Sequence, residues 1–387
     1  MNILINVTNA RNVGGGLQVA VNFIKKTIVY KRDDVEWFYV VSETMDKVYL
    51  KDDFRPQIPS DHYFVFPNQP DFKHTFRSVQ KQLYELEQDK SIDVAFTILG
   101  PNYHLFKTKE VVRFVHPWVV TSNKYAWSNI PMKESLRMRM QIILLKYLVK
   151  KKGYVITQTN AVKDGLIEKL GMNPDCIRVV PNVLPAIFKD LDNSHIESND
   201  GWIDIASVGA GYHKNLNIIP EVIRILEDKY HLKNIRFHVT LPDGALGLNE
   251  INERVKQLGI SDRFVNHGNL RQQQLSELYR KCEYCFLPSV LEVFSASTLE
   301  AMFYNLPTVA TDLRFNTEVF KDACIYYEPM NAGEAATKLF EVMGSDEIKE
   351  KLREKMAKRL ESFSSFEQYF NNTVDFLIEV GEGKHNK

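Results

Sequence analysis

The chain has few cysteines, no long apolar run and no excess of charge of either sign. Four cysteines in 387 residues are too few for a disulfide scaffold. Cys282 and Cys285 have the spacing of a redox motif, but no second cysteine pair completes a zinc site. We therefore expect both to pack in the core. No apolar run approaches the roughly 20 residues that a membrane-spanning helix needs.

Charge and composition narrow the function classes further. Lys and Arg together number 49, as do Asp and Glu, which argues against a general nucleic-acid-binding protein. The first apolar run has no basic segment before it and no small-residue cleavage site, so we expect no signal peptide and a cytoplasmic protein. A chain of 387 residues, 44% hydrophobic and 25% charged, predicts a globular protein of two or three domains.

Short apolar runs alternate with helical patterns twice along the chain. In the first half we predict strands at 1–7, 37–41, 62–66, 92–96 and 111–115, and helices at about 17–29, 73–88 and 133–152. The pattern begins again after Asn182, with strands at 204–208, 235–240, 284–287, 308–310 and 324–327, and helices at about 215–230 and 368–380. We also predict a helix, a strand and a helix between 250 and 284, a helix after strand 284–287, and two helical runs over about 333–361. Such alternation predicts parallel sheets with helices on both faces.

The expected fold is therefore α/β, with two doubly wound, Rossmann-like domains that face each other across a cleft. We predict one domain over 1–180 and a second over 181–362. We predict that residues 363–387 form a last helix and a polar tail. A return of this helix to the first domain stays open. Ligands of open α/β sheets bind beyond the carboxyl ends of the strands, so the loops after the strands are the candidate site.

Two glutamates stand in the most informative of these loops. Glu292 and Glu300 lie eight positions apart, after the predicted strand 284–287 and at the start of a helix. A helix N-terminus attracts anions, and carboxylates accept hydrogen bonds from hydroxyls. Two plainer interpretations stay open. Glu300 fits a capping box with Ser297, and Glu292 fits a solvated loop acid.

Three further features lie at predicted strand ends. Gly14, Gly15 and Gly16 follow the first strand, where glycines let a ligand approach the backbone. Lys214 follows strand 204–208 at the predicted start of a helix, where an anionic ligand would stabilise its charge. His116 follows strand 111–115. The plainer interpretations are a tight turn, a solvated lysine and a structural histidine.

Two other segments invite functional interpretations. Asp190 and Asp192 form the only Asp-x-Asp triplet, which can hold a divalent metal on a diphosphate. We interpret it as a surface loop and predict no required metal. The predicted helix 133–152 carries seven basic residues and one acid, which is typical of a helix on an anionic membrane surface. A packing helix with a solvated basic face is the interpretation we favour, and peripheral membrane contact stays open.

Together these residues resemble the family-4 glycosyltransferases, which are retaining enzymes with the GT-B fold. Glu292 and Glu300 match the family's motif of two glutamates separated by seven residues. The surrounding sequences also resemble the family: Leu287-Pro-Ser289, Leu299-Glu-Ala-Met302, Pro307–Asp312, Thr157–Asn160 with Val180-Pro-Asn182, Lys214-Asn215, and Gly268 with Leu275–Tyr279. The match is specific in the C-terminal half and thinner in the N-terminal half.

The resemblance implies the roles of the site residues. Glu300 would bind the ribose, and Glu292 the donor sugar. Lys214 and the backbone from Phe294 to Leu299 would hold the diphosphate. His116 would sit near the transferred sugar, so that His116, Lys214 and Glu292 form the catalytic set. The implied donor-binding residues are Gly14, Gly15, Gly16, Lys214, Asn269, Leu270, Glu292, Phe294, Ser295, Ala296, Ser297, Thr298, Leu299 and Glu300.

The resemblance also implies partners. The substrates would be a nucleotide-diphosphate sugar and an oligosaccharide or lipid-linked acceptor in bacterial surface polysaccharide (O-antigen or capsule) synthesis, with no cofactor and no nucleic acid. The first domain would be the acceptor side, and the second would bind the nucleotide sugar. The protein would be cytoplasmic, with the inner face of the cytoplasmic membrane as an alternative location.

Two departures from the family pattern bear on the donor site. Ala210 stands where many members carry an arginine that helps to hold the diphosphate, and His213 or Arg271 are the candidates to compensate. The loop at 293–297 has serines in place of the family's glycine and proline. Two other functions stay open: a nucleotide-sugar epimerase of similar shape, and a non-catalytic relative that binds a glycan or nucleotide.

Overall fold

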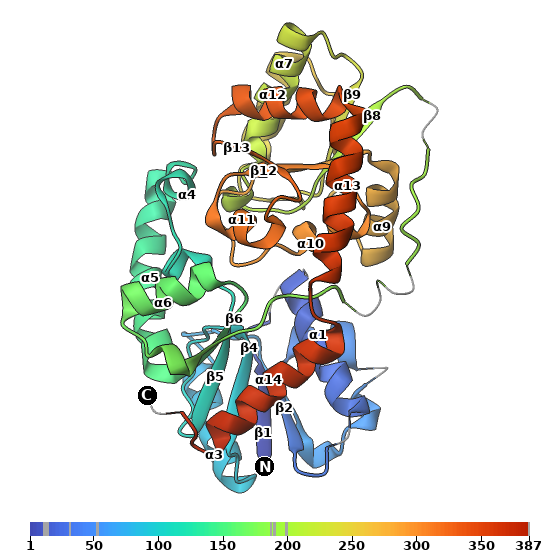
Figure 1. Cartoon of the computed structure of the whole chain (residues 1–387). Helices are drawn as coiled ribbons and strands as arrows, with labels where there is room; N and C mark the ends of the chain where they lie inside the picture. Colours follow the sequence, from blue (N-terminus) through green and yellow to red (C-terminus); the bar gives the residue numbers. More distant parts are fainter. Residues whose placement is uncertain are drawn as a thin grey trace. The chain divides into compact units, whose positions relative to one another are not determined.

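The computed structural model describes residues 1–10, 15–30, 32–51, 54–185, 188, 191–197 and 200–385 (Figure 1). These residues form two compact units. Unit 1 comprises Met1–Val120, Leu136–Ala186 and Ser364–Lys387, and unit 2 comprises Thr121–Ser135 and Ile187–Phe363. Each unit is built on one parallel sheet with helices on its faces.

The sheet of unit 1 has seven parallel strands in the order β3-β2-β1-β4-β5-β6-β7. The strands are β1 (Asn2–Val7), β2 (Glu36–Ser42), β3 (Tyr63–Phe66), β4 (Val94–Gly100), β5 (Lys109–Phe114), β6 (Gly153–Thr157) and β7 (Ile177–Val179). The helices are α1 (Gly15–Val29), α2 (Glu43–Met45), α3 (Phe76–Asp89), α6 (Asn160–Leu170) and α14 (Phe366–Gly381), with α5 (Met132–Lys152) entering the unit at Leu136.

The strands predicted for this unit are all present, but β6, β7 and α6 were not predicted. β6 follows α5 without a loop, because Gly153 turns the chain with φ of +89° directly after Lys152. A positive φ is accessible to glycine at little cost. A helix that runs straight into a strand offers no turn signal between them, so the hydrophobic pattern did not reveal the boundary.

The last helix, α14, packs on the sheet of unit 1 (Figure 1). Phe370 is fully buried, and its ring centroid lies 4.9 Å from that of Phe23 in α1. Arg178 of β7 pairs with Glu379 of α14 at 2.6 Å. The core of unit 1 is therefore assembled from the two ends of the chain.

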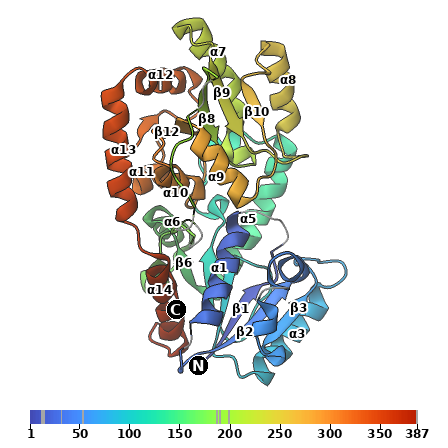
Figure 2. The ribbon, with the colours of Figure 1, turned by 90° about the vertical axis from the view of Figure 1, so that its right-hand side faces the viewer.

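Unit 2 has six parallel strands in the order β10-β9-β8-β11-β12-β13. They are β8 (Ile203–Ser207), β9 (Ile235–Val239), β10 (Phe264–Asn266), β11 (Tyr284–Leu287), β12 (Thr308–Thr311) and β13 (Ile325–Tyr327). The helices of unit 2 are α4 (Lys124–Ser128), α7 (Ile219–Tyr230), α8 (Leu248–Leu258), α9 (Gln272–Lys281), α10 (Ala296–Phe303), α11 (Arg314–Phe320), α12 (Ala332–Met343) and α13 (Asp346–Glu361). Several of them are seen beside the sheet in Figure 2.

The segment Thr121–Ser135 groups with unit 2, whereas the sequence placed it inside the first domain. The side-chain amide of Asn123 donates a hydrogen bond to the carbonyl oxygen of Val290 at 2.8 Å. The amide of Asn129 donates to the carbonyl oxygen of Tyr212 at 3.0 Å and to Oδ1 of Asn215 at 2.9 Å. Such long-range side-chain contacts leave no local signal in the sequence.

A buried ion pair joins α5 to the sheet of unit 1. Lys152 Nζ lies 2.6 Å from Glu110 Oε2, and the two side chains are 1% and 3% exposed. Nζ also donates to Oδ1 of Asn102 at 2.6 Å and to the carbonyl oxygen of His104 at 2.8 Å, while Thr97 donates to Glu110 at 2.6 Å. Burial, followed by the nearby lysine charge, lowers the pKa of His104 to about 4.

We predict that Lys152→Met lowers the free energy of unfolding by about 3–5 kcal/mol, because the Glu110 carboxylate is left buried without its counter-charge. Urea denaturation followed by circular dichroism measures the change. The double variant Lys152→Met/Glu110→Leu should recover part of the loss. Lys151→Met, at the exposed neighbouring position, is the control and should change stability little. A Lys152→Met protein as stable as the wild type would contradict the prediction.

Candidate functional site

The candidate site of unit 2 lies where the strand order of its sheet reverses. β8 and β11 are neighbours, with Tyr284 opposite Ile205 and Cys285 opposite Ala206. The chain leaves β8 toward β9 on one side and leaves β11 toward β12 on the other. The loops after these two strands therefore diverge above their carboxyl ends, which is where open α/β sheets bind ligands.

The loop after β8 carries Lys214. The residue ends a short 3₁₀ turn, Tyr212–Lys214, and α7 begins only at Ile219, so the prediction that Lys214 starts the helix was wrong. Gly209 has φ of +131°, and a Cβ built on it would lie 2.6 Å from Cε of Lys214. The lysine side chain therefore packs directly on the glycine backbone, and no larger residue fits there without moving it.

The loop after β11 brings Glu292 to this lysine. Lys214 Nζ lies 2.5 Å from Glu292 Oε1, and the two side chains are 14% and 12% exposed. Burial favours the neutral form of Glu292, but Lys214 and then His213 outweigh it and lower the pKa of the carboxyl. Glu292 also accepts a hydrogen bond from Ser289 at 3.3 Å. It is therefore a paired acid, and the interpretation of a solvated loop acid was wrong.

Lys214 also reaches the N-terminus of α10. Its Nζ donates to Oγ of Ser295 at 3.1 Å, and the hydroxyls of Ser295 and Ser297 are 2.7 Å apart. Ser295 is the N-cap residue of α10, and no side chain caps the helix. A lysine, serine hydroxyls and the first turn of a helix thus converge on one point, which is a suitable arrangement for an anion.

Glu300 does not cap α10. The helix begins at Ala296, so Glu300 is its fifth residue, and the capping box with Ser297 was wrong. Its carboxylate accepts instead a hydrogen bond from the hydroxyl of Tyr279, at 2.8 Å. Burial raises the pKa of Glu300, against the opposing effects of Tyr279 and Lys214. This partner was not predicted, because Tyr279 lies in α9, and only the packing of α9 on the sheet, where it contacts β8, brings the two residues together.

The backbone from Phe294 to Leu299 forms the end of this loop and the first turn of α10. Phe294, Ser295, Ser297, Thr298 and Leu299 are buried, and Ala296 is exposed. The five buried side chains pack inward, whereas Ala296 faces solvent. Asn269 and Leu270 lie in the loop between β10 and α9, with Asn269 exposed and Leu270 half-buried.

The predicted residues of the first half of the chain belong to unit 1. Gly15 and Gly16 are the first residues of α1, and Gly14 lies outside the described residues. His116 is half-buried and precedes the 3₁₀ turn Pro117–Val119 after β5. Both segments therefore lie at the carboxyl ends of strands, β1 and β5, as the sequence predicted.

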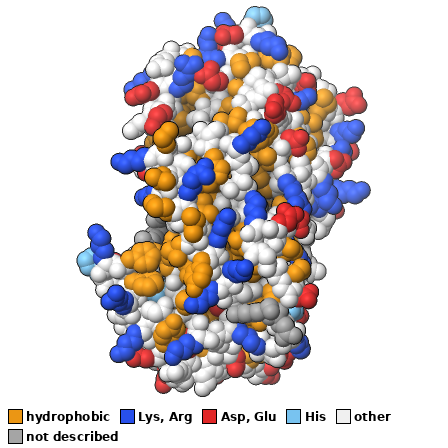
Figure 3. Space-filling model, turned by 90° about the vertical axis from the view of Figure 1, so that its left-hand side faces the viewer, with side chains coloured by type: hydrophobic (Ala, Val, Ile, Leu, Met, Phe, Trp, Pro, Cys, Tyr) orange, Lys and Arg blue, Asp and Glu red, His pale blue; other side chains and the backbone are white. Residues whose placement is uncertain are grey.

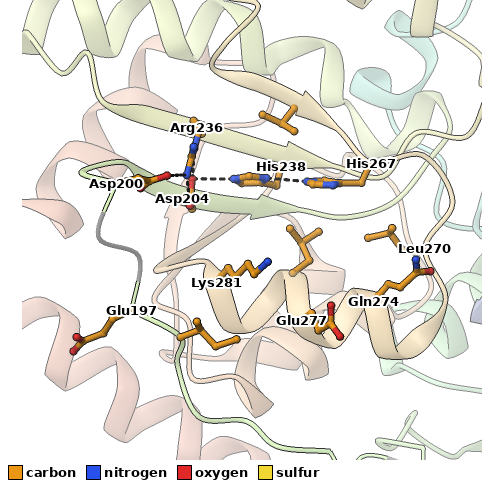
Figure 4. Close-up of a pocket in the computed structure, with 13 residues that line it drawn as sticks. Glu197, Asp200, Asp204, Arg236, His238, His267, Leu270, Gln274, Glu277 and Lys281 are labelled. Carbon is orange, nitrogen blue, oxygen red and sulfur yellow. Dashed lines mark hydrogen bonds and ion pairs between the residues drawn. The ribbon is translucent and has the colours of Figure 1, made fainter.

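A separate cavity of about 580 Å³ lies between the sheet of unit 2 and α9 (Figure 4). Of the predicted donor-binding residues it contains only Leu270. His238 bridges Asp204 and His267 with hydrogen bonds of 2.9 Å on each side, and Arg236 Nε bonds Asp204 at 2.7 Å. The Asp204 carboxylate is therefore paired with the Arg236 guanidinium and hydrogen-bonded to the His238 ring. This network was not predicted, because its members lie in β8, in β9 and just after β10, which become neighbours only in the fold.

The Asp-x-Asp triplet and the pair of cysteines form no recognisable site in the part of the chain that the structure describes. Among the described residues, no group of three or more His, Cys, Asp or Glu side chains is arranged to hold a metal ion. Asp192 pairs with Arg280 at 2.6 Å, and Asp190 lies outside the described residues. Cys282 and Cys285 are buried with free thiols, whose pKa values burial raises, as expected of core residues.

The cavity network should make stability depend on pH. Burial favours the neutral form of Asp204, but hydrogen bonds from His238 and Arg236 outweigh it and lower its pKa to about 2. Because the pKa of Asp204 is lower in the folded state, its carboxylate stabilises that state at pH values above the unfolded-state pKa of about 3.9. This contribution is lost as the pH falls toward 2.

We predict that Asp204→Asn lowers the free energy of unfolding by about 2 kcal/mol at pH 7. The difference from wild type should shrink below pH 4. Urea denaturation at several pH values measures it. Asp262→Asn, at an exposed position, is the control, and an unchanged difference at low pH would contradict the assignment.

Comparison with known proteins relates most of unit 2 to a known family. Residues 189–361 match the family model described as "Glycosyl transferases group 1". The O-antigen chain mannosyltransferase RfbU of Salmonella typhimurium is 26% identical over 187 residues, which cover 48% of this chain and 50% of RfbU. The match thus spans about half the length of this curated relative.

Solved structures match over the whole chain. Sucrose-phosphate synthase from Thermosynechococcus elongatus aligns with a TM-score of 0.71 at 13% identity and covers 98% of each chain. HepE of Anabaena, in complex with UDP and glucose, aligns with a TM-score of 0.68 at 13% identity and covers 97% of this chain and 99% of its own. Residues 189–361 are therefore similar to the glycosyl transferases group 1 family, and the two doubly wound units of the chain have the GT-B fold.

Proposed function

We propose that the protein transfers a sugar from a nucleotide-diphosphate donor to a glycan acceptor with retention of the anomeric configuration. The observation that carries the proposal is the convergence of Lys214, Glu292 and the N-terminus of α10 at the strand-order reversal of unit 2. A cation and a helix dipole aimed at one point stabilise the negative charge that develops on a departing diphosphate.

The two glutamates suit the two ends of such a donor. Glu292 is held ionised by Lys214 and lies beside the anion position, where it would accept hydrogen bonds from the hydroxyls of the transferred sugar. Glu300 lies farther along α10, oriented by Tyr279, and would accept hydrogen bonds from the ribose. When the diphosphate binds, Lys214 would share its charge between the phosphate oxygens and Glu292.

Unit 1 would supply the acceptor side. We propose that Gly14, Gly15 and Gly16 approach the donor phosphate or the acceptor through their backbone, and that His116 lies near the transferred sugar. A donor oxygen would take the proton of the attacking hydroxyl, so that the protein positions the reactants and stabilises charge. We propose no metal or other cofactor for this step.

The acceptor that we propose is a growing surface glycan, and the site of action is the cytoplasm. The likeness of about half of the chain to an O-antigen chain mannosyltransferase supports a role in surface polysaccharide synthesis. Ala210, where many family members carry arginine, lies near His213, whose backbone carbonyl accepts a hydrogen bond from Val290 N at 2.7 Å. The burial of His213 lowers its pKa, so this side chain is a poor substitute for a permanent cation.

Nucleotide binding tests the donor site. We predict that one of UDP, GDP, dTDP and CDP, without added metal, stabilises the wild type by about 2.7 kcal/mol when present at about 100 times its dissociation constant. Glu300→Ala should respond much less, because the ribose loses its acceptor. Thermal unfolding with each nucleotide, with and without Mg²⁺, measures both effects. Glu277→Ala, an acid that lines the separate cavity, is the control and should respond like the wild type.

Three outcomes would overturn this part of the proposal. No response to any nucleotide would leave a non-catalytic protein that binds a glycan as the better interpretation. An equal response in Glu300→Ala would remove the ribose role. Loss of the response in Glu277→Ala alone would place the nucleotide in the cavity between the sheet and α9.

Donor turnover tests the chemistry. We predict that Lys214→Met lowers the rate of donor cleavage or transfer by about 10²–10³-fold, the usual cost of removing one charge-stabilising group. Gly209→Ala should reduce the rate in the same direction, because its Cβ would displace the lysine side chain. NMR of the freshly formed product reports the anomeric configuration. Inversion of configuration, or a Lys214→Met enzyme as fast as the wild type, would contradict the mechanism.

A further inference from the structure

Helix α5 of unit 1 has apolar residues on two opposite faces. Its inner face packs against the unit through Ile142, Leu145, Leu148 and Val149, which are at most 7% exposed. Its outer face carries Leu136, Met140, Ile143, Leu144 and Tyr147, which are 64%, 61%, 69%, 44% and 60% exposed. At about 100° per residue, these five side chains fall within about 100° of arc, so they form one continuous stripe.

Basic side chains border this outer face of α5 on both sides. By the same helical period, Arg137 lies along one edge of the stripe, and Arg139, Lys146 and Lys150 lie along the other. Lys151 follows the last turn of the stripe, with its Nζ 5.9 Å from the centre of the Tyr147 ring. The helix contains one acid, Glu134. In Figure 3, which views the side of the molecule where α5 lies, hydrophobic side chains gather among Lys and Arg side chains.

A second exposed aromatic residue lies beside the helix. Phe72 is 60% exposed, and its ring centroid lies 5.1 Å from that of Tyr103. Gln141 of α5 donates a hydrogen bond to the Tyr103 hydroxyl at 2.8 Å. A further exposed apolar side chain, in the segment before α3, therefore lies near α5. Contiguous apolar patches of this kind mark interaction surfaces on soluble proteins.

We propose that the outer face of α5 binds an anionic lipid bilayer. Apolar side chains of an interfacial helix enter the boundary between headgroups and acyl chains, while flanking Lys and Arg extend to the anionic headgroups. Each such cation near the surface contributes about 1 kcal/mol. The stripe from Leu136 to Tyr147 is about 17 Å long. No helix in the part of the chain that the structure describes is long and apolar enough to cross a membrane, so the contact would be peripheral.

Charge favours a lipid surface over a second copy of this chain. Two copies of the outer face would bring basic borders against basic borders, with Glu134 as the one acid on each helix. Protein interfaces are generally depleted of lysine. An anionic lipid layer instead offers apolar chains to the stripe and negative charge to both of its edges. The proposal goes beyond sugar transfer, since lipid binding needs no donor.

Vesicle flotation tests the proposal with the full-length protein. Wild type should float with vesicles of phosphatidylcholine and phosphatidylglycerol, and much less with phosphatidylcholine alone. The variant Met140→Ser/Ile143→Ser/Tyr147→Ser should bind at least about tenfold more weakly. Arg139→Gln/Lys150→Gln should weaken binding several-fold at about 0.1 M salt and less at about 1 M, where screening is already strong.

Matched controls come from exposed residues elsewhere. Val29→Ser/Leu246→Ser removes apolar side chains that are 75% and 58% exposed and should leave flotation unchanged. Lys47→Gln/Lys81→Gln removes two cations whose side chains are 71% and 79% exposed, and it should also bind like the wild type. Circular dichroism of each variant establishes that it is folded.

Several outcomes would overturn the proposal. They are a wild type that does not float, an α5 variant that floats as well as the wild type, and controls that lose binding equally. A wild-type dimer in light scattering that the triple serine variant converts to a monomer would make the face a protein interface. The nucleotide thermal shift of the same samples separates the two proposals. A protein that shifts with nucleotide but does not float retains the proposed function and loses only the lipid contact.

Discussion

The parallel pairing of β8 with β11 is the constraint on which the candidate site depends. Two strands that lie about 80 residues apart in the sequence end side by side, and the order of the sheet reverses between them. Their loops carry Lys214 and Glu292, so the ion pair follows from the sheet topology. Gly209, directly after β8, then fixes the path of the lysine side chain, because only a residue without Cβ fits beneath it.

Two carboxylates on one loop and helix have opposite electrostatic environments. Glu292 faces a lysine and is held in its ionised form, whereas Glu300 faces a tyrosine hydroxyl and has its pKa raised by burial. The arrangement separates a charge-paired acid next to the anion position from a hydrogen-bonding acid farther along α10. Their chemical difference thus comes from their neighbours in the loop after β8 and in α9, since the two side chains are identical.

Much of the architecture could be predicted from hydrophobic periodicity, and most of the contacts could not. The buried strands of both sheets and the helix pattern after each are visible as apolar runs, as in β1 and β11. β6 was missed because a glycine with positive φ joins it to α5 without a turn sequence. Tyr279 was missed as the partner of Glu300 for a different reason. The hydrogen bond depends on how α9 packs, and no residue type near Tyr279 encodes that packing. On α5, composition alone could not separate Ile142, which is buried, from Ile143, which is exposed.

The return of α14 to unit 1 has a consequence for the order in which the protein forms during synthesis. The core of unit 1 includes Phe370 and Leu377, which leave the ribosome after the whole of unit 2. At about 5–20 residues per second, the strands of unit 1 would wait roughly 10–40 s for the helix that covers them. The apolar surface that Phe23 presents to α14 would be uncovered for that time. Unit 2, from Ile187 to Phe363, can complete its own sheet first, so the second half of the chain is expected to mature before the first.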